Sequence, residues 1–103
     1  MIGDLFSKLQ EARERIEEAK KRLNDIIIEV DSGHGEIKIK ANANKTLTAV
    51  EISEQFMTTA SREELEALIM KTVNKALEEA ALKGEMEMKS ITRDVLPNFP
   101  GLL

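Results

Sequence analysis

A seven-residue repeat of apolar side chains runs without a break through the first quarter of the sequence. It consists of two rows, one formed by Ile2, Leu9, Ile16 and Leu23 and the other by Leu5, Ala12, Ala19 and Ile26. Because rows three residues apart share one side of an α-helix, the repeat predicts a helix over residues 2–25 with a narrow apolar seam. Such a seam requires a second helix alongside it, from the same chain or from another copy. The helix or dimer seam is expected to comprise Leu5, Leu9, Ala12, Ile16, Ala19 and Leu23.

The period of the apolar residues then changes to two. Three short alternating runs lie within residues 26–53, and they read "IIIEVD", "EIKIKANA" and "TLTAVEIS". In the third run, Thr48, Val50 and Ile52 are expected to face inward. Alternating runs that are separated by short polar turns predict a three-stranded antiparallel meander with one buried face.

The turn lengths predict how the strands pair. A four-residue turn over 32–35 places Val30 opposite Ile37, and a two-residue turn over 44–45 places Ile39 opposite Val50. Both registers keep apolar residues on the same face of the sheet. The same registers place the lysines of the middle run as follows: Lys38 between Glu29 and Glu51, and Lys40 between Ile27 and Ala49.

The piece "GHGEIKIK" contains the only histidine, His34, beside two glycines. A general base needs an orienting carboxylate and a nucleophile, and a transition-metal site needs several strong ligands; neither set accompanies His34. The glycines lie between two strands, so they do not form a phosphate loop, which connects a strand to a helix. The piece is interpreted as a hairpin turn. We therefore expect no catalytic residue, metal, cofactor or small-molecule substrate.

After a loop, Ser61 followed by Glu64 forms a capping box, which predicts that a second helix begins there and runs over 61–94. A broad apolar stripe suits this helix to lie on the sheet as far as Gly84. Beyond Gly84 the stripe thins to three residues, Met86, Ile91 and Val95. The tail 95–103 contains both prolines and ends regular structure. The predicted fold is a single α+β domain over 1–103, in the order α-βββ-α.

The composition restricts the class of protein further. The 103 residues include no cysteine and carry a net charge of -4, with 15 Lys and Arg against 19 Asp and Glu. The lack of cysteine suits a reducing cytoplasm, and no apolar run approaches the roughly 18 residues of a membrane span. We expect a cytoplasmic protein without a membrane partner. The negative balance argues against a uniformly basic nucleic-acid binder, so the local arrangement of charge decides.

Cations and anions are segregated on the first predicted helix. The cations flank the seam, and they are Lys8, Arg13, Arg15, Lys20 and Arg22. Two interpretations remain open: the cations pair with acids of a partner helix, or two such helices form arms whose cations contact phosphates. Lys40 and Lys45 of the sheet region are also available to an anion. With no Tyr or Trp and three Phe, the chain is poorly suited to stacking on single-stranded bases.

Over nearly its whole length, the sequence resembles the YbaB/EbfC family of bacterial nucleoid-associated proteins. The hairpin "SGHGEIKIKANANKTLTAVEI" is similar to the family's Gly-x-Gly-x-Val-Lys-Val … Val-x-Ile pattern. The stretch "LEALIMKTVNKALEEA" is similar to a Leu-rich helix containing Asn-Asp-Ala, and "LPNFPGLL" to a Pro-Gly tail. The sequence departs from the family at Lys75, where Asp is usual, at "ISEQF", where Ile-Asp-Pro is common, and at "ANANK", which lacks a turn glycine.

The resemblance implies a homodimer with tweezer-like helical arms that binds double-stranded DNA in the nucleoid and affects chromosome organisation or gene regulation. It does not assign the residues that contact DNA. The candidates, taken from the seam flanks and the sheet, are Lys8, Arg13, Arg15, Lys20, Arg22, Lys40 and Lys45. The alternative hypothesis is a dimeric adaptor whose helical arms clasp a protein partner.

Overall fold

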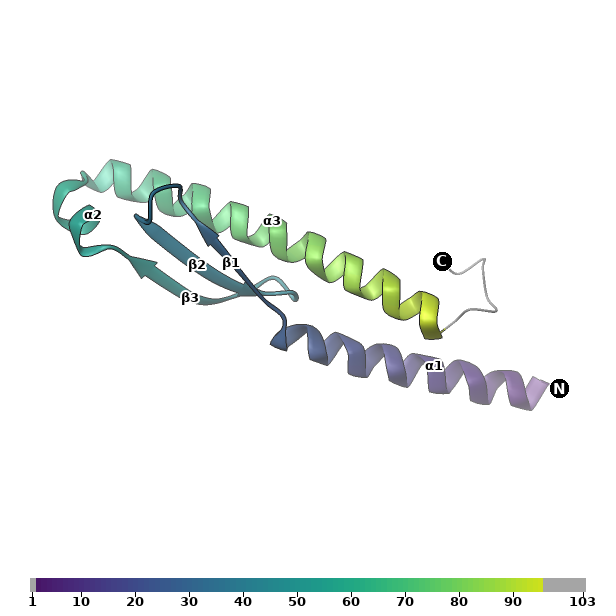
Figure 1. The fold of residues 1–103 in the computed structure, drawn as a ribbon. Helices are drawn as coiled ribbons and strands as arrows, with labels where there is room; N and C mark the ends of the chain where they lie inside the picture. Colours follow the sequence, from purple (N-terminus) through teal and green to yellow (C-terminus); the bar gives the residue numbers. More distant parts are fainter. Residues whose placement is uncertain (1, 96–103) are drawn as a thin grey trace.

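The computed structural model describes residues 2–95, and it shows two long helices connected through a three-stranded sheet (Figure 1). In chain order the elements are α1 (Ile2–Arg22), the short 3₁₀ helix η1 (Leu23–Asp25), β1 (Ile27–Asp31), β2 (Ile37–Asn42), β3 (Thr46–Ile52), α2 (Glu54–Thr59) and α3 (Arg62–Val95). The α+β fold predicted from the change of period is confirmed. Apart from Val95, the Pro/Gly tail lies outside the described residues.

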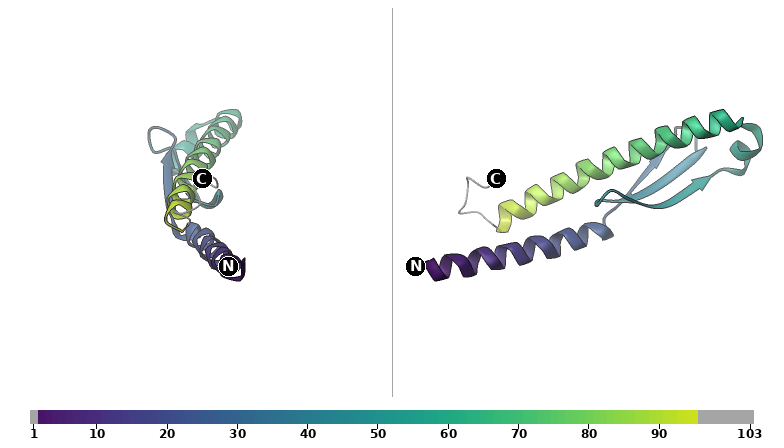
Figure 2. Two further views of the ribbon diagram at one scale, coloured as in Figure 1. Left: turned by 90° about the vertical axis from the view of Figure 1, so that its right-hand side faces the viewer. Right: turned by 180° about the vertical axis from the view of Figure 1, so that it is seen from behind.

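The core lies between the sheet and α3. The sheet is antiparallel with the strand order β1-β2-β3, and α3 runs along one of its faces (Figures 1 and 2). Ile37 and Ile39 of the central strand are fully buried, and α3 contributes Ala76 and Ala80 to the same cluster. Since alanine is small, the helix can approach the sheet closely at these positions. The alternation of β2 therefore exposes its two lysines on the opposite face.

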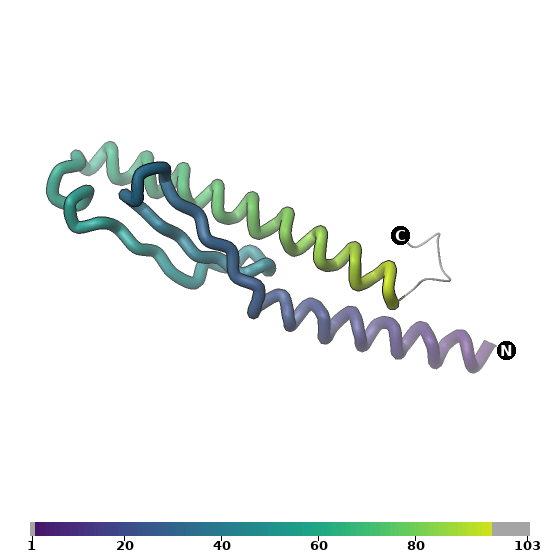
Figure 3. The backbone as a smooth tube through the Cα atoms, viewed as in Figure 1, coloured from purple at the N-terminus to yellow at the C-terminus, as the bar shows by residue number. Residues whose placement is uncertain are grey.

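α1 ends next to the sheet, and it runs antiparallel to the last part of α3 (Figure 3). Ala12, Ala19 and Leu23 of the seam are buried. Towards the N-terminus the cover ends, and Leu5 and Phe6 are 45% and 67% exposed. The result is an elongated molecule of 69 × 20 × 17 Å.

The register between β1 and β2 differs from the predicted one by two residues. Val30 pairs with Ile39 instead of Ile37. A hydrogen bond from Ser32 N to the carbonyl oxygen of Ile37, 2.9 Å long, closes the hairpin, so the loop comprises 33–36. A shift of two residues keeps every side chain on its face. The alternation of apolar residues therefore cannot distinguish the predicted register from the observed one.

The register between β2 and β3 follows the prediction only in part. Val50 pairs with Ile39 as expected, but a bulge at Thr48 brings Leu47 opposite Ala41 nearer the turn. Leu47 therefore packs against the core, whereas Thr48, expected to face inward, is exposed. Val50 remains 49% exposed because β3 is an edge strand and α3 covers it less than the other two.

The connection from β3 to the second long helix, expected as a loop, contains the short helix α2. Its N-cap is Ser53, whose Oγ accepts a 3.1 Å hydrogen bond from Phe56 N. The predicted N-cap at the start of α3 is present, but the glutamate bonds the serine hydroxyl instead of the serine amide that a full capping box uses. Glu64 N donates to Ser61 Oγ at 3.1 Å, and Ser61 Oγ donates to Glu64 Oε1 at 3.2 Å.

Gly84 marks the point where α3 passes the turn between β2 and β3. It is buried, and a Cβ atom at this position would overlap the carbonyl oxygen of Ala43. Beyond it, Ile91 and Val95 are half-buried. Met86 was expected to continue the apolar stripe, and this was wrong: Met86 is 66% exposed, because its place on the helix faces away from α1 and the sheet.

Candidate nucleic-acid interface

The cations that flank the seam of α1 form two lines. Lys8, Arg15 and Arg22 lie seven residues apart on one flank, and Arg13 and Lys20 lie seven residues apart on the other. Seven residues make nearly two helical turns, so neighbours in a line are about 10 Å apart along the axis. All five side chains are exposed. The helix therefore presents a row of positive charge on each side of its apolar seam.

Few of these cations are neutralised within the chain. Lys20 Nζ lies 3.5 Å from Glu17 Oε1, and both side chains are more than half exposed, so this pair contributes little stability. Among residues 2–95, the other four cations of these two lines take part in no ion pair within 4 Å: Lys8, Arg13, Arg15 and Arg22. Their charge is available to an external anion.

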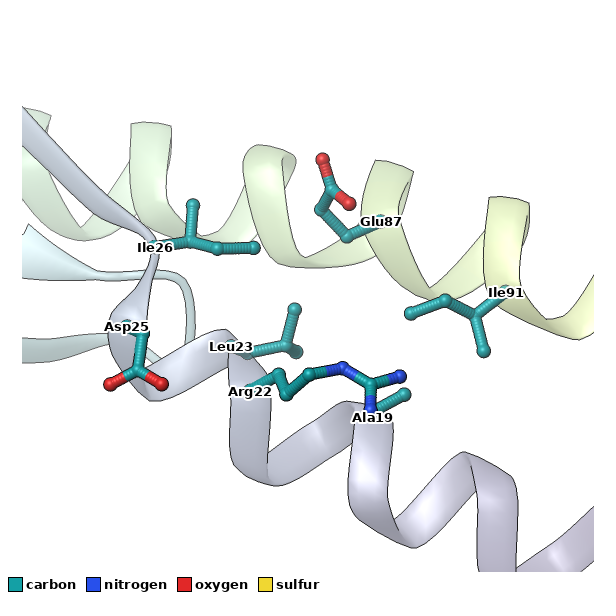
Figure 4. A pocket seen from close by; sticks show the side chains of 7 residues that line it. All are labelled: Ala19, Arg22, Leu23, Asp25, Ile26, Glu87 and Ile91. Atoms are coloured by element: carbon teal, nitrogen blue, oxygen red, sulfur yellow. The ribbon is translucent and has the colours of Figure 1, made fainter.

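A groove of about 320 Å³ separates the base of α1 from α3 (Figure 4). Its lining is mainly apolar and includes Leu23, Ile26 and Ile91. Figure 4 shows the guanidinium of Arg22 lying along α1, with Glu87 across the groove on α3. Glu87 Oε1 is paired with Lys83 Nζ at 3.1 Å. Arg22 therefore borders the groove, while the acid opposite it already has a cation.

The observed register changes the surroundings of the sheet lysines. Lys40 pairs with Glu29 and Ala49, so the expectation that it faces Ile27 was wrong. Lys38 lies between Asp31 and Glu51. The reason is the two-residue shift of β1, which moves each acid of that strand along its neighbour. Lys40 thus has an acid on the adjacent strand, which weakens its case as a site for an external anion.

The turn between β2 and β3 is the junction of the molecule. It has three residues between paired positions rather than the two expected, and Lys45 N donates to the carbonyl oxygen of Asn42 at 3.0 Å. Ala43 N donates to the carbonyl oxygen of Ile26 at 2.9 Å. Asn44 Nδ2 donates to the carbonyl oxygen of Lys20 at 2.9 Å and to Asn24 Oδ1 at 2.7 Å. The turn is thereby fixed to the end of α1.

Sequence reasoning missed this junction. Asn44 was read as one of two ordinary turn residues, because asparagine is common in turns and its side-chain partners are 20 and 24 residues away in the sequence. Because Asn44 and its partners lie far apart in the sequence, no local sequence pattern indicates these hydrogen bonds. The one available signal was a lysine at the end of a turn where glycine is usual.

The loop that contains His34 is closed by the two carboxylates beside it. Asp31 Oδ1 accepts hydrogen bonds from the amides of Gly33 and Gly35, at 2.7 and 3.0 Å, and both glycines have positive φ angles. Glu36 Oε1 accepts from His34 N at 2.8 Å. Both acids are thus used to hold the backbone, and the loop has the geometry of a hairpin connection.

These hydrogen bonds affect the titration of both acids. The amides of Gly33 and Gly35 lower the pKa of Asp31. The pKa of Glu36 is lowered by its own amide, by the Ser32 hydroxyl and by the His34 amide. In each case donors directed at the carboxylate favour its charged form.

A shallow hollow of about 250 Å³ lies beside this loop. It is lined by His34, Glu36, Ser53, Gln55, Phe56 and Thr59. Within residues 2–95, no group of three or more His, Asp or Glu side chains is arranged to hold a metal ion. The helices of the same segment include none with the length and apolar character of a membrane span.

Residues 1–95 match the model of the YbaB/EbfC DNA-binding family. The chain belongs to this family. Three nucleoid-associated proteins illustrate how closely YbaB/EbfC relatives resemble it. Those of Flavobacterium johnsoniae and Chlorobium phaeobacteroides are 32% and 30% identical to it, covering 95% of this chain and 91% and 92% of their own. That of Thermoanaerobacter pseudethanolicus is 32% identical, covering 98% of this chain and 89% of its own.

The YbaB/EbfC fold is also seen in a solved structure. A crystal structure of an uncharacterized protein from Helicobacter pylori superposes with a TM-score of 0.70, covering 93% of this chain and 97% of that one. At 17% sequence identity, this likeness concerns the fold alone.

Proposed function

We propose that this chain is a nucleoid-associated protein that binds double-stranded DNA as a homodimer, mainly through phosphate contacts. Membership of a DNA-binding family supports DNA as the partner. The observation that carries the proposal is the pair of exposed cation lines on α1, which are seven-residue spaced and almost without intramolecular partners. Cations arranged in this way suit the regularly spaced charges of a duplex backbone.

The dimer is supported by the seam itself. The seam is covered where Ala12, Ala19 and Leu23 are buried, and it is open around Leu5. An exposed apolar edge at the end of a helix favours burial against another helix. A second copy offers the same edge, and a twofold arrangement brings two sets of cations to one duplex. Its likeness to relatives named nucleoid-associated proteins supports action in the nucleoid. The role that we propose there is in chromosome organisation or gene regulation.

The test is a titration of duplex DNA across salt concentrations, run beside a measurement of mass in solution. If a dimer neutralises about six phosphates, log K falls with log salt at a slope near -5. A protein of monomeric mass, or one that does not bind a duplex at low salt, contradicts the proposal.

The second candidate is a dimeric adaptor that clasps a protein partner, with the basic flanks used for helix pairing. Charge reversal of Arg13, Arg15 and Lys20 distinguishes the two. Loss of DNA affinity with an intact dimer supports DNA binding, whereas loss of the dimer supports pairing. A matched variant that reverses Arg62, Lys71 and Lys75, three exposed cations of α3 away from α1, makes the same change in net charge.

A further inference from the structure

Lys45 has an unusual backbone. Among residues 2–95 it is the one residue other than glycine with a positive φ, 61°. This left-handed conformation strains any residue that has a Cβ atom, and glycine adopts it without strain. A glycine at position 45 would make the same turn at lower energy. The side chain of Lys45 is exposed and takes part in no ion pair within the described segment, so packing or pairing does not explain it.

The turn that carries Lys45 is held rigidly against α1. Asn44, its neighbour, donates one hydrogen bond to Lys20 O in the last turn of α1 and one to Asn24 Oδ1 of η1. On the other side, Gly84 of α3 packs against the carbonyl of Ala43 without room for a Cβ atom. Lys45 therefore has a fixed position next to the last turn of α1.

That last turn is basic, with Lys20, Lys21 and Arg22 in succession. The acids nearby are Glu17, which is 3.5 Å from Lys20, the exposed Glu18 one turn before Arg22, and the exposed Asp25 of η1. Glu87 across the groove is paired with Lys83. A polyanion that binds across both elements gains the charge of Lys45 in addition to that of the last turn of α1.

We propose that Lys45 and the last turn of α1 form one composite phosphate contact, with Asn44 as the positioning residue that holds the two parts together. This inference rests on the proposed binding of duplex DNA. It adds Asn44, which does not itself contact phosphate, to the residues needed for binding. It also gives a reason for the strained backbone at Lys45.

The first experiment compares Lys45→Gly, Lys45→Arg and Lys71→Gln with the wild type in duplex titrations across salt. Lys45→Gly relieves strain and removes a charge, so stability and affinity move in opposite directions. Its Tm rises by roughly 2–4 °C. Its salt slope becomes shallower by about 2 in a dimer, with a loss of affinity of roughly tenfold or more near 100 mM salt. Lys45→Arg and Lys71→Gln keep the wild-type slope.

The second experiment tests the role of Asn44 by a double-mutant cycle. Asn44→Ala retains every cation but releases the turn, so it lowers affinity and makes the slope shallower while the mass and circular dichroism stay unchanged. If Lys45 acts only when Asn44 holds it, the double variant Asn44→Ala/Lys45→Gly loses less affinity than the sum of the single losses. Additive losses overturn the role of Asn44.

The outcomes separate this inference from the function on which it rests. A wild-type protein that fails to bind a duplex at low salt overturns both. Binding by the wild type, together with an unchanged salt slope in Lys45→Gly, overturns the composite contact alone. Loss of slope in Lys45→Gly but not in Lys71→Gln supports it.

Discussion

At the scale of single residues, Gly84 occupies a position without room for a Cβ atom. Its backbone lies against the carbonyl of Ala43, in the turn that also holds α1. A methyl group there has no space, so helix and turn must separate to admit it. Such a movement also disturbs the neighbouring contacts of α3 with the sheet.

We expect Gly84→Ala to destabilise the protein by about 1–3 kcal/mol, although alanine is the better helix former. Urea unfolding measures the change. Gly3→Ala is the control, because a Cβ atom at position 3 meets nothing within 4 Å; its effect should stay within about 0.5 kcal/mol. Equal stability of Gly84→Ala and the wild type would mean that the close approach is absent.

A second prediction at this scale concerns Asp31 and Glu36. Their pKa values are lowered in the folded chain, so the stability they contribute is present above the pKa of an unfolded carboxyl group and is lost as the pH falls. Tm should decline below about pH 4. Asp31→Asn should lower Tm at neutral pH, and its difference from the wild type should shrink in acid. Glu29→Gln removes an acid from the same strand but not from the loop. If it reproduces the Asp31→Asn profile, the loop is not the cause.

At the scale of elements, the sequence predicted which segments form helices and strands better than it predicted the register between neighbouring strands. The seven-residue repeat, the alternating runs and the capping box at Ser61 located the two long helices and the strands. The registers needed more, because the loop is set by hydrogen bonds to Asp31 and Glu36, and the bulge at Thr48 by backbone geometry. The two-residue shift leaves the alternation of apolar residues unchanged, whereas the bulge turns Leu47 inward in place of Thr48. The site shows the same division, since the cations were visible in the sequence and the Asn44 contacts were not.

The N-cap at Ser61 gives a prediction for α3. Ser61→Ala removes the acceptor of the Glu64 amide and should cost about 1 kcal/mol. Thermal unfolding at one protein concentration measures it. Ser90→Ala changes an exposed serine inside the same helix and should be neutral or slightly stabilising. A loss at Ser90 as large as that at Ser61 would point to a general effect of serine rather than to the cap.

At the scale of the whole molecule, the covered and uncovered parts of the seam differ in what they can do. Its base packs within the chain, and its N-terminal end, around Leu5 and Phe6, is open. We expect Leu5→Asp to weaken the proposed dimer, as measured by analytical ultracentrifugation. Affinity for a duplex should fall with it, because two linked sets of cations become separate.

The control is Leu82→Asp, which places the same charge on another exposed leucine, 57% accessible on the outer face of α3. It should leave the dimer intact. If Leu82→Asp dissociates the dimer and Leu5→Asp does not, the copies meet through α3 and the seam has another role.

The junction at the base of α1 also affects how precisely the N-terminal end of that helix is positioned. With 21 residues, α1 is about 30 Å long, so it acts as a lever pivoted at η1. A swing of about 10° at the pivot displaces the tip by about 5 Å, more than the 3.4 Å step of one DNA strand. The two hydrogen bonds from Asn44 restrain α1 next to this pivot, and contacts with α3 restrain it further along its length. A protein without the Asn44 hydrogen bonds would keep all its charges, but the direction of α1 would be held less firmly.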